Sequence, residues 1–218
     1  GKLFNVLAIA LAGHKQGCPA KVAVISSGFM GSINGTAVAN VVGTGSFTIP
    51  LMKKIGYHKN FAGAVEASAS VGGQILPPVM GASAFIMAET TGVSYGTIAL
   101  AATLPALLYY LGVMAQVHFR AGKDNLKGVP KADLPRVKDV LKERGHLLIP
   151  IVALVFFLFQ SIPVSYAAVY TIVLTVSVAS FRKTTRMGLK DILEALADVA
   201  KQSLSVMAAC AVVGIIIG

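Results

Sequence analysis

A break inside an apolar stretch constrains the fold of this chain more than any other feature. Residues 61–90 are mostly apolar and long enough to cross a membrane, but they contain the segment 68–78, Ser-Ala-Ser-Val-Gly-Gly-Gln-Ile-Leu-Pro-Pro. Gly72 and Gly73 each weaken a helix by about 1 kcal/mol relative to alanine. Pro77 and Pro78 lack N–H donors and push the residues before them away from helical angles. We therefore predict two half-helices that meet at a polar, unwound joint, which must be buried in protein or line a cavity.

The composition places this joint in a membrane. Apolar residues make up 55% of the 218 residues and charged residues only 13%, against about 25% charged residues in a soluble domain. We expect an all-α integral membrane protein. Because the chain begins with no recognisable element and ends within an apolar run, we interpret it as a piece of a longer polypeptide.

Cysteine usage and net charge indicate no further chemistry. Cys18 and Cys210 are far apart and fit neither a disulfide framework nor a metal site. The net charge of +10 comes from basic residues between apolar spans, with no aromatic-rich basic motif. We expect no nucleic-acid partner and interpret the charge as positive-inside topology.

Two shorter apolar arms precede the joint. Residues 20–30 and 37–52 flank a small, polar, turn-prone cluster at 31–36, and each arm covers about half to three quarters of a membrane core. The pattern predicts a re-entrant hairpin over about 20–52, with a single kinked span over about 22–50 as the alternative. Lysines lie before and after the two arms, so both ends favour the cytoplasmic side, as a hairpin requires.

The rest of the chain alternates apolar spans with basic loops. We predict a first region over 1–119, which contains the hairpin, the broken span 61–90 and a clean span 97–119. A cytoplasmic loop over 120–145 follows, with a short surface helix at 134–143. A two-span hairpin over 146–181 comes next. All nineteen Lys and Arg fall on the side that this topology places in the cytoplasm.

The last segment, 189–218, is predicted in two parts. Residues 189–201 have apolar side chains at helical spacing and charges on the other face, but they are too few to span a membrane. They predict an interfacial helix. Residues 203–218 then begin another span.

Polar groups at membrane depth are the candidate binding residues. They are Ser32, Asn34, Gly35 and Thr36 at the hairpin tip, and Ser68, Ser70, Gly72, Gly73, Gln74, Pro77 and Pro78 in or beside the joint. Sodium prefers neutral or anionic oxygens, which unwound half-helix ends supply as carbonyls, while half-helix N-termini offer N–H groups to a carboxylate. We expect the tip and the joint to face each other near mid-membrane. Helix packing by small residues is the alternative role for the serines.

The acidic residues and the absence of known catalytic motifs give little indication of an enzyme. Glu66 is placed near the cytoplasmic end of the broken span and Glu89 near its outer end, so function and simple solvation both stay open for each. The sequence contains no GxSxG, HExxH, CxxC or GxxxxGK[ST] motif, and no His, Asp or Lys at depth to activate a serine. We predict that the protein is not an enzyme, has no cofactor, and has no metal site beyond the candidate sodium ligands.

Two blocks of the chain resemble a known family. Residues 31–50, Gly-Ser-Ile-Asn-Gly-Thr-Ala-Val-Ala-Asn-Val-Val-Gly-Thr-Gly-Ser-Phe-Thr-Ile-Pro, and residues 68–89 resemble the large permease component of TRAP (tripartite ATP-independent periplasmic) transporters. They look closest to the fused-permease branch that works with TAXI-type binding proteins. Residues 195–218 extend the likeness over nearly the whole chain. Residues 70–73, Ser-Val-Gly-Gly, differ from the Gly-Pro-x-x-Pro-Pro pattern of the non-fused branch.

The resemblance implies a function and a set of partners. It implies a sodium-driven importer of organic acids, such as carboxylates, in the inner membrane of a bacterium or archaeon. A periplasmic substrate-binding protein would deliver the substrate, and the small membrane component, the second repeat of the permease and membrane lipids would be the other partners. Sodium would be the coupling ion. A non-transporting membrane scaffold subunit is the alternative, and an intramembrane enzyme is a third interpretation.

The resemblance also implies a fold. It is an elevator-type transporter with two inverted repeats, each with a re-entrant hairpin and a broken helix. Residues 32–36 match the first hairpin tip, residues 68–78 match the first broken helix, and 189–218 lead into the second repeat. By this likeness the second half of the site lies outside these residues, so we expect no transport by this chain alone.

Overall fold

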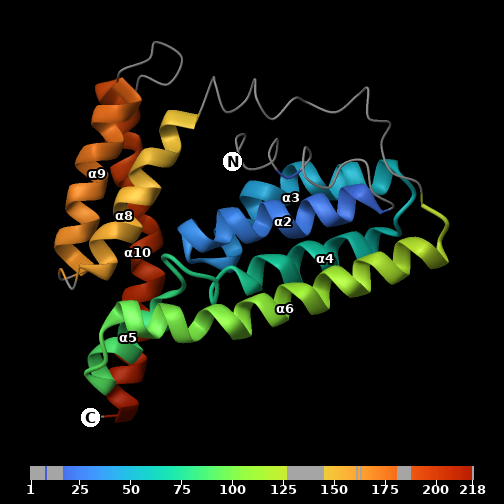
Figure 1. The fold of residues 1–218 in the computed structure, drawn as a ribbon. Helices are drawn as coiled ribbons and strands as arrows, with labels where there is room; N and C mark the ends of the chain where they lie inside the picture. The colour runs from blue at the N-terminus through green and yellow to red at the C-terminus, as the bar shows by residue number, and fades with distance from the viewer. Residues whose placement is uncertain are drawn as a thin grey trace.

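The computed structural model describes residues 8, 17–126, 145–160, 162, 164–180 and 188–217, which form helices and no strand (Figure 1). The expected all-helical fold is confirmed. The helices are α2 (Cys18–Asn34), α3 (Ala37–Lys54), α4 (Lys59–Gly72), α5 (Ala82–Thr91), α6 (Tyr95–Lys123), the 3-10 turn η2 (Gly145–Leu148), α8 (Ile149–Phe159), α9 (Val164–Ser180) and α10 (Leu189–Ile217). The predicted surface helix at 134–143 lies outside the described residues.

Helices α2 and α3 form a tight antiparallel pair. Gly35 ends α2 in the left-handed region, with φ of 69°, and its N–H donates to the Gly31 carbonyl at 2.9 Å. A side chain at Gly35 would meet the Met80 carbonyl, because a Cβ there would lie 2.3 Å from that oxygen. This turn reverses the chain and excludes the single kinked span.

The broken helix is present, but it breaks later than the sequence suggested. Helix α4 continues to Gly72, residues 73–81 are unwound, and α5 begins at Ala82. Ser68 and Ser70 are therefore helical. Glycines near a helix end cost little, whereas the consecutive prolines cannot continue the ladder, so the unwound part lies around Pro77 and Pro78.

Four helices lie side by side in one bundle: α2, α3, α4 and α6 (Figure 1). Their shared core is rich in alanine, which lets the helices approach closely; it contains Ala20, Ala23, Val24, Met52, Tyr57, Ala62, Val65, Ala69, Val117 and Ala121. The first turns of α2 and α4 and the last turns of α3 and α6 carry the basic residues Lys21, Lys53, Lys54, Lys59, Arg120 and Lys123. Because the helices run antiparallel, these cations gather at one end of the bundle.

The tip of the hairpin lies partway along α6. Helix α6 has 29 residues and a mean hydropathy of 1.8 in its most apolar window, and within the described residues it is the one helix long and apolar enough to cross a membrane. At about 1.5 Å per residue it is about 44 Å long, whereas the 17 residues of α2 extend about 26 Å. The end of α4 contacts Tyr109, the middle residue of α6. The joint is therefore level with the middle of this helix.

The C-terminal part differs from the expectation at one point. Helices α8 and α9 form an antiparallel pair (Figure 1). The sequence predicted an interfacial helix to residue 201 and a separate span from 203, but α10 is one continuous helix from Leu189 to Ile217. No glycine or proline lies between residues 189 and 213, so nothing in the backbone interrupts the helix where the charges end.

Candidate functional site

The hairpin tip and the joint touch through backbone. Val79 in the unwound segment donates its N–H to the Ser32 carbonyl at 2.9 Å. A Cβ at Gly73 would lie 2.5 Å from the Cα of Gly31. Any side chain at either glycine would separate the two segments, so the contact requires glycine on both sides.

A buried carboxylate lies behind this contact. Glu66 of α4 is fully buried, and its Oε1 accepts hydrogen bonds from Ser27 Oγ at 2.7 Å and from Ser70 Oγ at 3.3 Å. The Thr44 hydroxyl also donates to Oε1, and the Thr48 hydroxyl donates to Oε2. Of the two interpretations left open for Glu66, simple solvation does not apply, because α2 and α3 cover this face of α4 and the side chain is fully buried. Glu89 is exposed on α5.

Asn40 connects the Glu66 cluster (Ser27, Thr44, Thr48, Glu66 and Ser70) to the tip. Its side chain is fully buried, and its Nδ2 donates to the Ser27 carbonyl at 2.8 Å. A Cβ at Gly31 would lie 2.8 Å from Asn40 Nδ2 and 2.6 Å from the Cα of Gly73, so the amide lies against the contact between tip and joint. Asn40 Oδ1 is buried there with no hydrogen-bond partner among the described residues, and the Thr36 hydroxyl at the tip has none either.

The structure brings together only some of the predicted site residues. Ser32, Gly35, Thr36, Ser70, Gly72 and Gly73 lie at or behind the contact between tip and joint. Asn34 and Thr36 line an open cleft of about 620 Å³. Val199, Ser203 and Met207 of α10 line the same cleft. Gln74, Pro77 and Pro78 line smaller clefts against α6, away from the tip.

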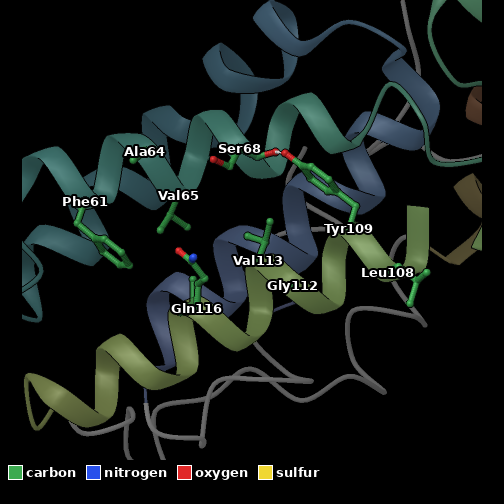
Figure 2. A pocket seen from close by; sticks show the side chains of 10 residues that line it. Phe61, Ala64, Val65, Ser68, Leu108, Tyr109, Gly112, Val113 and Gln116 are labelled. Carbon is green, nitrogen blue, oxygen red and sulfur yellow. Dashed lines mark hydrogen bonds between the residues drawn. The ribbon is translucent and has the colours of Figure 1, made fainter. Parts of the chain in front are cut away.

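Ser68 faces away from the tip, into a groove between α4 and α6 (Figure 2). The groove has a volume of about 480 Å³ and is mostly apolar. Tyr109 donates its hydroxyl to the Ser68 carbonyl at 2.9 Å, and Tyr110 donates to the Ala69 carbonyl at 2.7 Å. Because the Gly73 N–H bonds to the Ser70 carbonyl instead of that of Ala69, the two tyrosines satisfy carbonyls near the end of α4.

The family is shown by comparison with known proteins. All of the chain, residues 1–218, matches the family described as "Tripartite ATP-independent periplasmic transporter, DctM component". The chain belongs to this family. The resemblance drawn from residues 31–50 and 68–89 is confirmed at the level of the large TRAP permease, and members of this family are transporters, not enzymes.

The chain matches part of the length of several TRAP permeases. The sialic acid TRAP transporter large permease protein SiaM of Vibrio cholerae is 30% identical over 152 residues, which are 69% of this chain and 35% of that protein. The C4-dicarboxylate TRAP transporter large permease protein DctM of Vibrio cholerae is 31% identical over 135 residues, 62% of this chain and 29% of that protein. The isethionate TRAP transporter permease protein DctMQ of Oleidesulfovibrio alaskensis is 30% identical over 156 residues, 70% of this chain and 24% of that protein. The chain thus spans 24–35% of the length of these three relatives.

Sequence reasoning missed the residues that surround Glu66 in this TRAP permease chain. Asn40, Thr44 and Thr48 recur every four residues, so they form one polar stripe along α3, and Glu66 and Ser70 form a second stripe on α4. Polar residues at this spacing share one face of a helix. Two such stripes in neighbouring apolar segments were the available signal.

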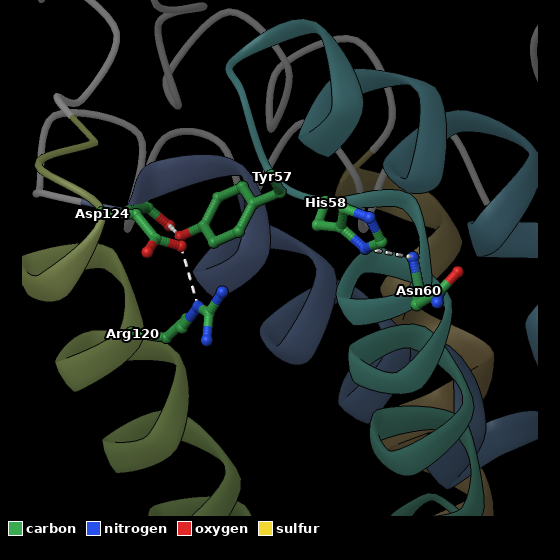
Figure 3. Close-up of polar contacts among 6 residues, drawn as sticks. Tyr57, His58, Asn60, Arg120 and Asp124 are labelled. Carbon is green, nitrogen blue, oxygen red and sulfur yellow. Dashed lines mark hydrogen bonds and ion pairs between the residues drawn. The ribbon is translucent and has the colours of Figure 1, made fainter.

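The basic end of the bundle holds structural contacts (Figure 3). The Tyr57 hydroxyl donates to the Gly17 carbonyl at 3.4 Å, and Arg120 Nε lies 2.8 Å from Asp124 Oδ2. Burial, followed by the negative charges of Asp124 and Cys18, raises the pKa of Tyr57 to about 12. The Tyr57 contact fastens the loop between α3 and α4 to the start of α2, whereas the Arg120–Asp124 pair lies within the end of α6. Within the described residues, no group of three His, Cys, Asp or Glu is placed to hold a metal ion.

Proposed function

We propose that this chain contains the first-repeat hairpin and broken helix of a sodium-coupled, binding-protein-dependent TRAP permease that imports organic acids. The observation that carries the proposal is the buried Asn40 amide, whose Nδ2 lies beside Gly31 where the hairpin tip meets the unwound joint and whose Oδ1 has no partner among the described residues. An unpaired buried amide oxygen costs about 1–3 kcal/mol unless a ligand satisfies it. A cation bound there would accept that oxygen as a ligand.

The surroundings suit a monovalent cation. Unwound half-helices present backbone carbonyls, and broken helices build ion sites in many secondary transporters. The joint is level with the middle of α6, as a midplane site requires. The Thr36 hydroxyl, also buried without a partner, adds a second uncharged oxygen at the tip.

An organic acid suits the cleft beside the tip. Helix α3 begins at Ala37 after the N-cap residue Thr36, whose side chain makes no capping hydrogen bond, and no acidic residue lies in the first turn. Free N–H groups at a helix N-terminus attract anions. Asn34 and Thr36 line the cleft of about 620 Å³ at this terminus. The three relatives are named for sialic acid, C4-dicarboxylates and isethionate, all of which are acids; we propose a carboxylate substrate for this protein.

The remaining parts of the proposal follow from the family. A periplasmic substrate-binding protein delivers the substrate, and the small membrane component and the second repeat complete the permease in the inner membrane, surrounded by lipid. Residues 70–73 favour the fused-permease branch. The polar contacts that join α2, α3 and α4 favour their movement as one body in an elevator cycle, with the hairpin entering and leaving the membrane on one side.

Uptake by the full-length permease tests this proposal. The protein and its binding protein are reconstituted in phospholipid vesicles, and uptake of labelled C4-dicarboxylate and sialic acid is measured with and without an inward sodium gradient. We expect uptake only with both the gradient and the binding protein, and we expect Asn40→Ala to raise the half-saturating sodium concentration about tenfold, as loss of a ligand worth about 1.4 kcal/mol requires. The matched control is Ser177→Ala, whose hydroxyl bonds its own helix at Val173. Equal uptake without sodium would overturn the coupling, and no uptake of any acid would favour a scaffold subunit.

A further inference from the structure

Glu66 has a burial and bonding pattern that helix packing alone does not require. Its carboxylate is fully buried, and four hydroxyls from three helices donate to it: Ser27 of α2, Thr44 and Thr48 of α3, and Ser70 of α4. No Lys, Arg or His among the described residues forms an ion pair with it. Every partner is therefore neutral.

A buried carboxylate without a cationic partner is costly. Moving an ion out of water carries a desolvation penalty of several kcal/mol, which hydroxyl donors only partly offset. Neutral or apolar residues of similar volume would join three helices at least as stably. The negative charge thus needs a reason beyond adhesion of α2, α3 and α4.

The Glu66 cluster leads to the unpartnered oxygen at the joint. Glu66 binds the Ser27 hydroxyl, and the Ser27 carbonyl accepts the Asn40 amide at 2.8 Å. The Asn40 Nδ2 is fixed in this way and lies beside Gly31 at the contact with Gly73, while Oδ1 of the same amide is buried without a hydrogen-bond partner among the described residues. The chain of contacts therefore holds at the joint an amide whose acceptor is unsatisfied.

The carboxylate is also close enough to act by its charge. Glu66 lies seven residues before Gly73, the residue that caps the end of α4, or about 10 Å along the helix axis at about 1.5 Å per residue. Across a protein interior from which water is excluded, a full charge at this distance changes cation affinity by about tenfold or more. The field is attractive for a cation at the joint.

We propose that Glu66 is a positioning residue and the fixed negative charge of the cation site at the joint. It acts through Ser27 on Asn40 and does not itself contact the ion. This inference rests on the proposed sodium coupling and assigns a role to a residue outside the tip and the joint.

The test is Glu66→Gln in the full-length permease reconstituted with its binding protein. The substitution keeps the shape of the Glu66 side chain. The Thr48 hydroxyl can accept a hydrogen bond from the new amide while it donates its own hydrogen to the Thr44 carbonyl, 3.0 Å away. We expect the half-saturating sodium concentration to rise about tenfold or more, with uptake at saturating sodium within about twofold of the unmodified protein. The matched control is Glu89→Gln, because Glu89 is exposed, and it should leave both quantities unchanged.

Two further variants separate charge from shape. Glu66→Asp keeps the charge and should change half-saturating sodium by less than about threefold, and an equal shift in both Glu66 variants would overturn the charge role. Ser27→Ala keeps Glu66 and the Ser27 carbonyl that holds Asn40, and it removes the hydroxyl that joins Ser27 to Glu66. It should therefore also weaken sodium dependence. If Glu66→Gln does not fold, an unchanged half-saturating sodium concentration in Ser27→Ala overturns the inference.

The outcomes distinguish this inference from the proposed function. Sodium-independent uptake by the unmodified protein overturns both. Sodium-dependent uptake with an unchanged half-saturating concentration in Glu66→Gln overturns the inference alone. A loss of maximal uptake in Glu66→Gln with an unchanged half-saturating sodium concentration would show that Glu66 only holds the helices together, and it would also overturn the inference.

Discussion

Two regions of the molecule differ in whether their hydroxyl side chains bond across helices in addition to bonding within their own helix, as Thr44 and Thr48 of α3 do with the Asn40 and Thr44 carbonyls. In the bundle of α2, α3 and α4, buried hydroxyls bond across helices, as when Ser27 and Thr48 donate to Glu66. In α9, the hydroxyls of Thr171, Thr175 and Ser177 bond carbonyls four residues earlier in their own helix. The exposed apolar side chains of Ile172 and Val173 lie between Thr171 and Thr175 in the sequence.

The difference separates a polar core from an apolar surface. A hydroxyl that satisfies itself within its helix leaves that helix free to face lipid. Hydroxyls that need a neighbouring helix fix that neighbour in one position, and in the first bundle they fix it around the joint. Polar residues at four-residue spacing in two apolar segments thus have different consequences, according to whether neighbouring helices bury them.

The largest expected effect is at the backbone contact between tip and joint. Gly73→Ala places a methyl group 2.5 Å from the Cα of Gly31, and neither backbone can yield easily. We expect a loss of about 3 kcal/mol of stability, the upper end for overpacking, and loss of uptake. Thermal unfolding and sodium-driven uptake measure the two effects.

The control for that substitution is on the same helix. Gly63→Ala adds the same methyl group where nothing lies within 4 Å, and it should leave stability and uptake unchanged or slightly raise stability. Equal effects of the two substitutions would show that helix propensity, not the contact with Gly31, decides the outcome at Gly73.

Thr44→Val sharpens the contrast between the two uses of hydroxyls. It removes a buried donor to Glu66 and a partner of Ser27 at 2.9 Å, so it leaves a buried charge with less solvation. We expect a loss of about 2 kcal/mol. Thr175→Val, whose hydroxyl bonds the Thr171 carbonyl, should change stability by less than about 0.5 kcal/mol. Similar unfolding temperatures for the two variants would contradict the distinction.

Much of this fold could be predicted from residue types with fixed backbone consequences. The turn at Gly35 and the interruption before Pro77 and Pro78 both follow from local chemistry, and both are present. The burial of Glu66 could not be predicted, because its distance from the end of the span says nothing of α2 and α3 covering it. The end of the amphipathic pattern at residue 201 was taken for a helix end, but charge pattern alone does not stop a helix that lacks glycine or proline there.

Tyr110→Phe tests the attachment of α6 to the end of α4. The hydroxyl donates at 2.7 Å to the Ala69 carbonyl, whose expected helical donor, the Gly73 N–H, bonds Ser70 instead. We expect a loss of about 1 kcal/mol, measured by thermal unfolding. Tyr170→Phe is the control, since Tyr170 is exposed on α9. An unchanged unfolding temperature in Tyr110→Phe would mean that the Ala69 carbonyl has another donor.

The smallest expected effect concerns the exposed counterpart of Glu66. Asp124 carries the same charge, but it pairs with Arg120 at the surface of the basic end. Asp124→Asn should cost less than about 0.5 kcal/mol at low salt and nothing measurable at high salt, because exposed ion pairs are screened. A large loss of stability that does not depend on salt would show that the Arg120–Asp124 pair is shielded from solvent, as the Glu66 cluster is.

The same substitution has a second consequence through Tyr57. The pKa of Tyr57 is raised to about 12, chiefly by burial and then by Asp124. An acid whose folded pKa is raised contributes stability below its ordinary value near 10 and loses that contribution as the pH rises through 10 to 12. Tyr57→Phe should therefore flatten the fall of the unfolding temperature over this pH range, and Asp124→Asn should flatten it only slightly, because burial remains. A larger effect of Asp124→Asn than of Tyr57→Phe would mean that charge, not burial, governs this end of the bundle as it does the Glu66 cluster.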